Sequence, residues 1–242
     1  MRRFGDVDST NRVLLELARQ GAPEGTVVVA DHQTAGRGRL GRTWVAPAGS
    51  GLLMSVLLRP ALAPEQLHLA TAAVALAARA AVADVAGFEP GVKWPNDLVV
   101  GDRKLAGVLA EADFSGGGGA PAVVVGIGIN VNWPADVTEG LPIDVALGAT
   151  AANLVSGREV DRDAVLTSLL DHLAVQIGSW TAVASAYRRA CVTIGRAVRI
   201  ELPDETFTGT AADVSDDGHL LVDIGMCLRT VTAGDVVHLR PI

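Results

Sequence analysis

The chain has 242 residues, of which 49% are hydrophobic and 19% are charged, a balance that favours a folded globular protein over a disordered one. Its formal net charge of −7 argues against a general nucleic-acid binder, which would present a basic surface. The first residues lack the apolar core of a secretion signal, and Cys191 and Cys227 lack metal-ligand spacing, so we expect a reduced, cytoplasmic protein.

The N-terminal part predicts a helix and two strands around one long loop. Ser9 and its polar neighbours precede apolar residues at helical spacing up to Gly21, which predicts a capped amphipathic helix. Strands are expected over residues 26–30 and 52–58. Residues 31–50 between them are rich in glycine and arginine, and a loop of this length in a compact domain is usually functional.

An alanine-rich segment follows and predicts a long buried helix from Pro64 to Gly87. This segment contains His68, Arg79 and Asp84, whose polarity argues against a membrane-spanning helix. We therefore expect no association with a membrane.

The rest of the chain predicts a hairpin, further helices and a small β unit. Residues 92–100 and 105–111 are expected to form a hairpin that turns at 101–103, followed by a flexible tip at 116–119 and a strand over 122–131. Helices are expected over 161–180 and 183–190. The small β unit is expected to have short strands over 198–202, 208–214, 220–224 and 236–239, with a turn at 216–218. Because helices and hairpins are mixed, the predicted class is α+β with a mixed or antiparallel sheet. We expect two domains, residues 1–191 and a small barrel over residues 192–242.

Three arginines, Arg37, Arg39 and Arg42, lie within six residues of the long loop and suggest a small anionic ligand. The run from Gly36 to Gly41 formally matches the dinucleotide-binding pattern G-x-G-x-x-G, but no helix begins there and no acidic residue follows about 20 positions later. Glycines allow the backbone to approach a ligand, and arginines bind carboxylates or phosphates in pairs of hydrogen bonds. The alternative is a solvated basic loop.

Only two of the 20 basic residues are lysine, Lys93 and Lys104, and they lie in one segment. Lysine supplies a compact charge that arginine does not imitate. Pro95 within the motif K-W-P-N-D predicts a bulged or edge strand, which often re-aims side chains near a site. Lys104 begins the returning strand, where a lysine alternatively protects a sheet edge against aggregation.

The run from Gly126 to Asn132 alternates small and apolar residues within a predicted strand. Its glycines suggest close approach by a ligand or another backbone, or else a tightly packed central strand. The five histidines are scattered and form no metal-binding pattern. No nucleophile with its base is visible either, so catalysis by positioning and electrostatics is favoured.

Five motifs together closely resemble the biotin protein ligase family in order and spacing. They are D-S-T-N at 8–11, Gln33 with G-R-G-R-L-G-R at 36–42, K-W-P-N-D at 93–97, D-R-K-L-A-G at 102–107 and G-I-G-I-N-V-N at 126–132. The resemblance implies a class II synthetase-like catalytic domain and a C-terminal SH3-like barrel. It implies an ATP-dependent ligase that converts biotin to biotinyl-5′-AMP and then transfers biotin to a lysine of a biotin carboxyl carrier protein domain.

The resemblance also implies roles for individual residues. Biotin-binding residues would be Ser9, Thr10, Asn11, Gln33, Gly36, Arg37, Gly38, Arg39, Lys104 and Gly107. Residues that bind ATP or the adenylate would be Arg37, Arg39, Arg42, Trp44, Lys93, Asn96, Lys104 and Asn130. Lys104 and Arg39 would be catalytic, because carboxylate attack on a triphosphate brings anions together. Mg²⁺ would bridge the phosphates through ligands that the sequence does not identify.

Some members of the family carry an N-terminal helix-turn-helix, whereas here the D-S-T-N motif begins near the N-terminus. We therefore expect no nucleic-acid binding. The expected oligomeric state is a monomer or weak homodimer. Two other functions stay open at this point, a lipoate or octanoate ligase and a non-catalytic biotin-binding module.

Overall fold

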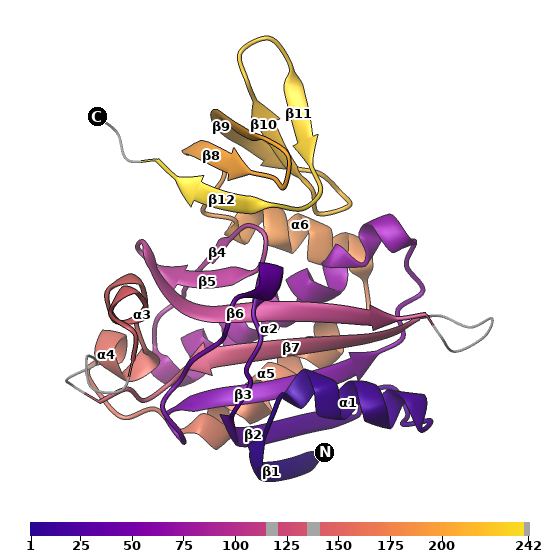
Figure 1. Cartoon of the computed structure of the whole chain (residues 1–242), viewed down its shortest axis with the longest axis vertical. Coiled ribbons are helices and arrows are strands. Elements are labelled where there is room, and N and C mark those ends of the chain that lie inside the picture. Colours follow the sequence, from indigo (N-terminus) through magenta and orange to yellow (C-terminus); the bar gives the residue numbers. More distant parts are fainter. Residues whose placement is uncertain (115–120, 135–140, 240–242) are drawn as a thin grey trace.

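The computed structural model describes residues 1–114, 121–134 and 141–239, and these residues form a large mixed sheet, a small antiparallel sheet and surrounding helices (Figure 1). The strands of the large sheet are β1 Arg2–Val7, β2 Val27–Gln33, β3 Gly51–Leu58, β4 Gly91–Lys93, β5 Asp97–Val100, β6 Arg103–Asp113 and β7 Ala122–Asn130. Their order is β1-β2-β3-β7-β6-β5-β4, and only β1 and β2 pair in parallel among the described strands. The α+β prediction is confirmed.

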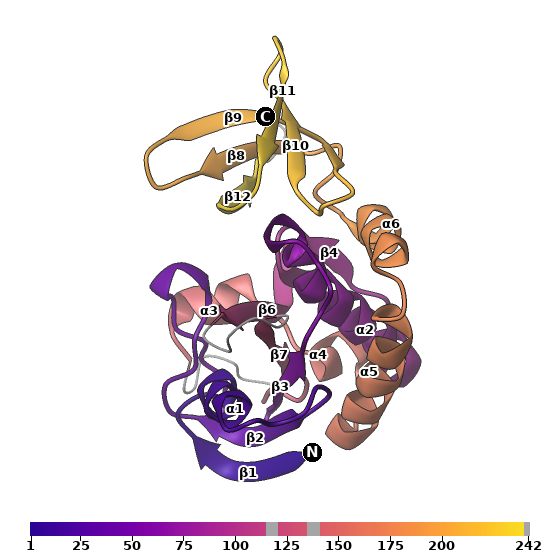
Figure 2. The same ribbon diagram turned by 90° about the vertical axis from the view of Figure 1, so that its right-hand side faces the viewer.

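Helices cover both faces of the large sheet (Figure 2). They are α1 Thr10–Arg19, α2 His68–Ala86, α3 Ile143–Gly148, α4 Ala152–Ser156, α5 Arg162–Gln176 and α6 Trp180–Ala190. Because side chains alternate along a strand, Val27 and Val29 of β2 belong to the main core with α2 and α5, whereas Val28 packs on the α1 side. The loop with the three arginines crosses the α1 side.

Helix α2 is the centre of the main core. The stretch Pro64–Ala86 is long and apolar enough to cross a membrane by length and composition alone, yet 72% of its most apolar window is buried inside the protein. It contacts α5, α6 and strands β4 to β7 of the large sheet. The prediction of a buried core helix is confirmed.

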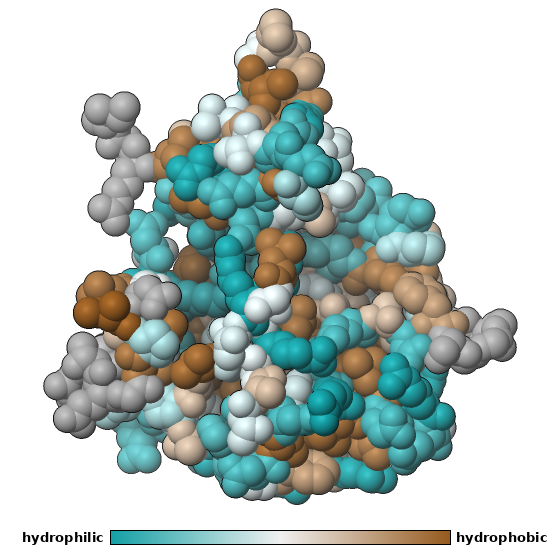
Figure 3. All heavy atoms as spheres, viewed as in Figure 1, coloured by the Kyte–Doolittle hydropathy of each residue, from teal (hydrophilic) through white to brown (hydrophobic). Residues whose placement is uncertain are grey.

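The C-terminal sheet is antiparallel, with the order β11-β10-β9-β8-β12. Its strands are β8 Ala197–Glu201, β9 Thr206–Val214, β10 Leu220–Asp223, β11 Leu228–Val231 and β12 Asp235–His238. Apolar side chains gather at the β10–β11 tip, where Met226 is almost fully exposed (Figure 3). Helix α6 ends at Ala190 and β8 begins at Ala197; the division at 191/192 stays a prediction.

Several local predictions differ from the structure. Residues 92–100, expected as one strand, form two antiparallel strands, β4 and β5, joined by a turn at residues 94–96. Of the two predicted alternatives, a bulged strand or an edge strand, the edge position is observed, because β4 ends the sheet order. The helix expected over 161–180 ends at Gln176, and Trp180 begins α6. Strands β1 and β11 and helices α3 and α4 were not predicted. The flexible tip expected at 116–119 lies outside the described residues.

Candidate active site

A cavity of about 300 Å³ lies where the arginine-glycine loop, the large sheet and the small sheet meet. The loop, defined as residues 36–44, forms one side, and α1, β6 and β7 supply the opposite wall. Four lining residues come from the C-terminal sheet, namely Glu201, Asp235, Val236 and Val237. The small sheet is therefore part of the site, a role that the sequence left open.

The first turn of α1 supplies a buried polar wall. Gln33 Oε1 accepts hydrogen bonds from Thr10 N at 2.8 Å and from Thr10 Oγ1 at 3.0 Å. The Ser55 hydroxyl lies 2.8 Å from Thr10 Oγ1 and 2.6 Å from Asn11 Oδ1. Asn11 is accommodated because β7 has glycine at position 126, where a Cβ atom would collide with its amide. This wall can hydrogen-bond a polar ring at fixed positions.

The loop folds as a small hairpin of its own. Arg37 and Thr43 form an antiparallel bridge, Gly38 N donates to Arg42 O at 2.7 Å, and Trp44 N donates to Gly36 O at 3.0 Å. The hairpin turns at Leu40, whose φ of 54° is in the left-handed region. This pairing orders the three arginines with respect to the cavity.

Each loop arginine has a partner outside the loop. Arg37 Nη2 is 2.8 Å from Glu111 Oε2 on β6, and Arg42 pairs with Asp235 on β12. Arg39 Nη1 donates to Asn96 Oδ1 at 3.0 Å, and its Nη2 donates at 3.2 Å to the carbonyl oxygen of Gly234, the residue before β12. Burial lowers the pKa of Arg39, although the neighbouring carboxylates act in the opposite direction. Arginine stays charged regardless, so the site holds a partly buried cation.

Lys104 extends across Gly107 toward the turn of the K-W-P-N-D motif. Its Nζ lies 2.7 Å from Asp97 Oδ1 and 5.6 Å from the centroid of the Trp44 ring. A Cβ atom at Gly107 would lie 3.0 Å from Lys104 Nζ and 3.1 Å from the Trp44 ring. The glycine of K-L-A-G therefore leaves the space through which the lysine reaches the cavity.

The ring of Trp44 packs on Gly128, one of the two glycines of β7. A Cβ atom at Gly128 would lie 2.5 Å from Trp44 Cε2. The two glycines of G-I-G-I-N thus admit side chains, Asn11 at Gly126 and Trp44 at Gly128. Of the two alternatives drawn from the sequence, this packing matches a tightly packed central strand. Trp44 is partly buried and lines the cavity beside Lys104, and an aromatic ring so placed suits a planar heterocycle next to its phosphate.

The structure brings most of the predicted site residues together. Those that line the cavity are Ser9, Thr10, Asn11, Gln33, Arg37, Gly38, Arg39, Arg42, Trp44, Lys93, Asn96, Lys104 and Gly107. Gly36 and Asn130 are not among the lining residues. Gly36 is buried against the backbone of Trp44, and Asn130 Nδ2 donates to Thr150 O at 3.0 Å. The catalytic and binding roles themselves stay predictions.

Sequence reasoning missed Glu111 and Asp235, the carboxylates that hold Arg37 and Arg42. Glu111 lies seven positions after Lys104 on the same strand, so the predicted strand could have indicated that it lies near the site. Asp235 carried no such signal, because only the tertiary fold brings β12 to the loop.

No cluster of three or more histidine, cysteine or acidic residues able to hold a metal ion occurs in the parts of the chain that the structure describes. Mg²⁺ keeps several waters and commonly binds one or two carboxylates together with substrate phosphates. Asp97, which lines the cavity beside Lys104, fits such an arrangement. A magnesium ion delivered with a nucleotide is therefore compatible with these residues.

Comparison with known proteins gives a consistent result. The sequence profile of the biotin/lipoate A/B protein ligase family matches residues 4–130, and that of the biotin protein ligase C terminal domain matches residues 193–239. The chain is 40% identical to a biotin–[acetyl-CoA-carboxylase] ligase of Mycobacterium tuberculosis, over 96% of this chain and 86% of that protein. It is 32% identical to the bifunctional ligase/repressor BirA of Bacillus subtilis, over 95% of this chain and 71% of that protein.

A solved structure of biotin protein ligase from Aquifex aeolicus, in complex with biotin and ATP, superposes with a TM-score of 0.82. That protein shares 28% identity, and the alignment covers 99% of this chain and 98% of the other. The family predicted from the five motifs is confirmed: the chain belongs to the biotin protein ligases of the biotin/lipoate A/B protein ligase family.

Proposed function

We propose that this protein activates biotin with ATP in the cavity beneath the arginine-glycine loop and then transfers biotin to a lysine of a biotin carboxyl carrier protein domain. The observation that carries the proposal is that Lys104, the polar wall of α1 and Trp44 line one cavity, with Lys104 Nζ 5.6 Å from the centroid of the Trp44 ring. The wall would hold the bicyclic ring of biotin, and Trp44 would lie against adenine. The reacting carboxylate and α-phosphate would then meet at the Lys104 ammonium group.

In the first step, a carboxylate oxygen of biotin attacks the α-phosphorus of ATP, and the bond to pyrophosphate breaks. Two anions approach each other, so cations that are already in place lower the barrier. Lys104 and Arg39 would supply that charge, with Asp97 and Asn96 holding them in position. Mg²⁺ would neutralise the phosphates of the nucleotide.

In the second step, the amine of a carrier lysine attacks the acyl carbon of biotinyl-5′-AMP. An amide bond forms, AMP leaves, and the amine loses a proton. The adenylate is labile in water, so a loop that covers it serves the reaction. The hairpin of residues 36–44, held to β6 and β12 by its arginines, is placed for this role.

The partner is the biotin-accepting domain of a carboxylase, an assignment that rests on the family. We further propose that the enzyme acts as a monomer or weak homodimer in the cytoplasm, where its free cysteines, Cys191 and Cys227, stay reduced. DNA and membranes are not part of the proposed function.

The test is ATP–pyrophosphate exchange with biotin or lipoate as the acid. The proposal predicts exchange with biotin and none above background with lipoate. Exchange that depends on lipoate would assign the chain to the lipoate branch of the family. Incubation with a carrier domain, biotin and Mg·ATP, followed by streptavidin blotting, tests the second step, and failure to label would contradict transfer.

A further inference from the structure

Glu111 of β6 accepts hydrogen bonds from two sides of the site although it is not among the residues that line the cavity. Its Oε2 atom lies 2.8 Å from Asn11 Nδ2 of the polar wall and 2.8 Å from Arg37 Nη2 of the loop. Both donors belong to lining residues. A single carboxylate oxygen therefore joins the wall to the loop.

We propose that Glu111 is a positioning residue that sets the hydrogen-bonding polarity of Asn11 and couples occupation of the polar wall to the position of Arg37. The inference rests on the proposed function and deepens it, because it states which ligand groups this wall accepts. Glu111 itself touches no substrate in this arrangement.

The polarity of Asn11 follows from its partners. Its Nδ2 group donates to Glu111 Oε2 at 2.8 Å and to Leu109 O at 3.1 Å, which uses both amide hydrogens. Rotating the amide by 180° would place Oδ1 against two acceptors, one of them charged. Such an arrangement leaves polar groups unpaired and is costly inside a protein.

The remaining atom of the amide is Oδ1, which the Ser55 hydroxyl approaches at 2.6 Å. A carbonyl oxygen has two lone pairs, so one stays available. Asn11 can therefore accept a hydrogen bond from a ligand and has no donor to give. The wall is thus set to receive an N–H group, of which the ureido ring of biotin has two.

The coupling to the loop follows from the shared oxygen. The side chain of Arg37 is 41% exposed and that of Glu111 is 25% exposed, so an isolated pair at this position would stabilise the loop weakly. A ligand that fixes Asn11 also fixes the carboxylate, which then holds Arg37 with less loss of side-chain entropy. Removing the charge should loosen the loop and weaken biotin binding together.

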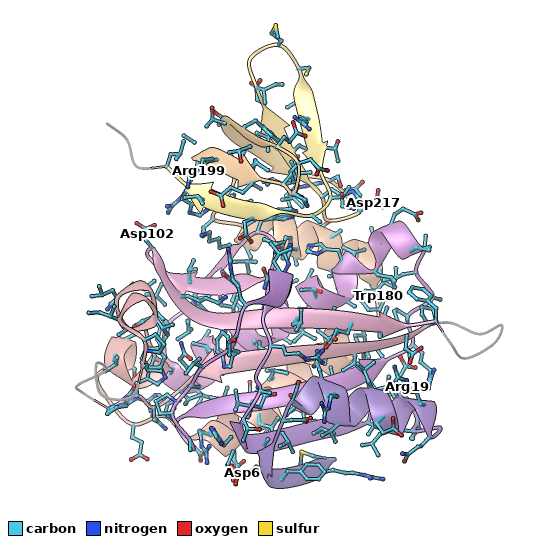
Figure 4. All side chains as sticks on the ribbon, viewed as in Figure 1. Asp6, Arg19, Asp102, Trp180, Arg199 and Asp217 are labelled. Carbon is cyan, nitrogen blue, oxygen red and sulfur yellow. The ribbon has the colours of Figure 1, made fainter. Side chains whose placement is uncertain are left out.

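The test compares Glu111→Gln with Asp113→Asn, which lies two residues further along β6. Asp113 Oδ2 is 2.8 Å from Nε of Arg19, a residue labelled on α1 in Figure 4. The control therefore removes a second carboxylate of β6, one that pairs with an arginine of α1, without touching Asn11 or Arg37. Two readouts are used, biotin kinetics and tryptic cleavage after Arg37, followed by mass spectrometry.

For Glu111→Gln we expect the KM for biotin to rise about tenfold with kcat changed less than about threefold, since a lost charged hydrogen bond weakens binding by about that factor. Cleavage after Arg37 should accelerate without ligand, and biotin should protect the loop less than in the wild type. Asp113→Asn should match the wild type in both readouts. If Glu111→Gln does not fold, Glu111→Asp should show the same pattern to a smaller extent.

A Glu111→Gln protein with the KM and the cleavage rate of the control would overturn the inference. Failure of the proposed function has a different signature. In that case the wild type shows no biotin-dependent exchange, while accelerated cleavage of Glu111→Gln without ligand still reports the contact between Glu111 and Arg37.

Discussion

Lys104 and Asp97 form an ion pair with Nζ 2.7 Å from Oδ1, although the register of β5 and β6 places Asp97 opposite Gly107. The lysine reaches its partner diagonally, and the missing side chain at position 107 is what leaves the path open. This geometry holds a flexible lysine in one position before any substrate binds. Such preorganisation is the main contribution that a fixed cation makes to a charged transition state.

Replacing Lys104 with alanine should lower the single-turnover rate of adenylate formation about 100- to 1,000-fold, the usual cost of removing one charge-stabilising group. The thermal midpoint should change little, because the side chain is partly exposed and Asp97 can be hydrated. Arg103→Ala, at the adjacent exposed position, is the control and should keep the wild-type rate. An unchanged rate for Lys104→Ala would remove this residue from the chemistry.

Gly128→Ala should displace the Trp44 ring, because the new Cβ would lie 2.5 Å from Trp44 Cε2. Overpacking of this kind costs about 1–3 kcal/mol of folding free energy. We expect a lower urea midpoint and a higher KM for ATP, with the KM for biotin less affected. Gly5→Ala, where the added atom meets nothing within 4 Å, serves as the matched control. Equal KM values for ATP in the two variants would contradict the packing argument.

The sequence predicted those site residues whose type is unusual for this chain and whose position is marked by a local secondary-structure signal. The arginines of the loop and Lys104 stand out by residue type in an acidic chain, and a hairpin signal placed Lys104 at a strand start. Helix α1 was predictable from its apolar spacing. The predicted side-chain cap was wrong, because Ser9 at the N-cap position makes no cap hydrogen bond and Thr10 and Asn11 lie inside the helix.

The remaining features depend on contacts between distant segments. Strand β1 lacks an apolar alternation because it is mostly exposed and held by backbone pairing to β2. Asp235 meets Arg42 across 193 positions of sequence. Asn130 was expected at the adenylate, but its side chain is buried and donates to Thr150 O. No local pattern in the sequence encodes these three arrangements.

Asp235→Asn should weaken the attachment of the loop to the small sheet, because the carboxylate pairs with Arg42. An exposed ion pair contributes up to about 1 kcal/mol, so the KM for ATP should rise about two- to fivefold. Glu205→Gln, which breaks the pair with Arg229 on the same sheet, should leave that KM unchanged. If both variants behave alike, this attachment has no role in nucleotide binding.

The stability of the protein should depend on pH through His68, the first residue of α2. Its ring centroid lies 6.3 Å from that of Trp94 and 5.8 Å from that of Tyr187, and burial lowers its pKa to about 4, with Arg39 and His219 adding to the shift. The unfolded chain has the ordinary value of about 6.5. Between these two values the unfolded state binds more protons than the folded state, so unfolding becomes easier as pH falls from about 6.5 toward 4.

Above about pH 6.5 both states hold the neutral ring, and His68 adds no pH dependence. The slope in the acid range approaches about 1.4 kcal/mol per pH unit for one such group. Carboxylates also titrate in this range, and so does His238, whose pKa burial lowers to about 4. The measurement is urea unfolding of the wild type and of His68→Phe at pH 7.5, 5.5 and 4.5.

The phenylalanine keeps an aromatic ring against Trp94 and Tyr187 and cannot titrate. The loss of stability between pH 7.5 and pH 4.5 should be smaller in the variant by about 2 kcal/mol. Parallel pH profiles would mean that His68 is protonated with little cost in the folded protein, because water or a moved side chain then accommodates the charge.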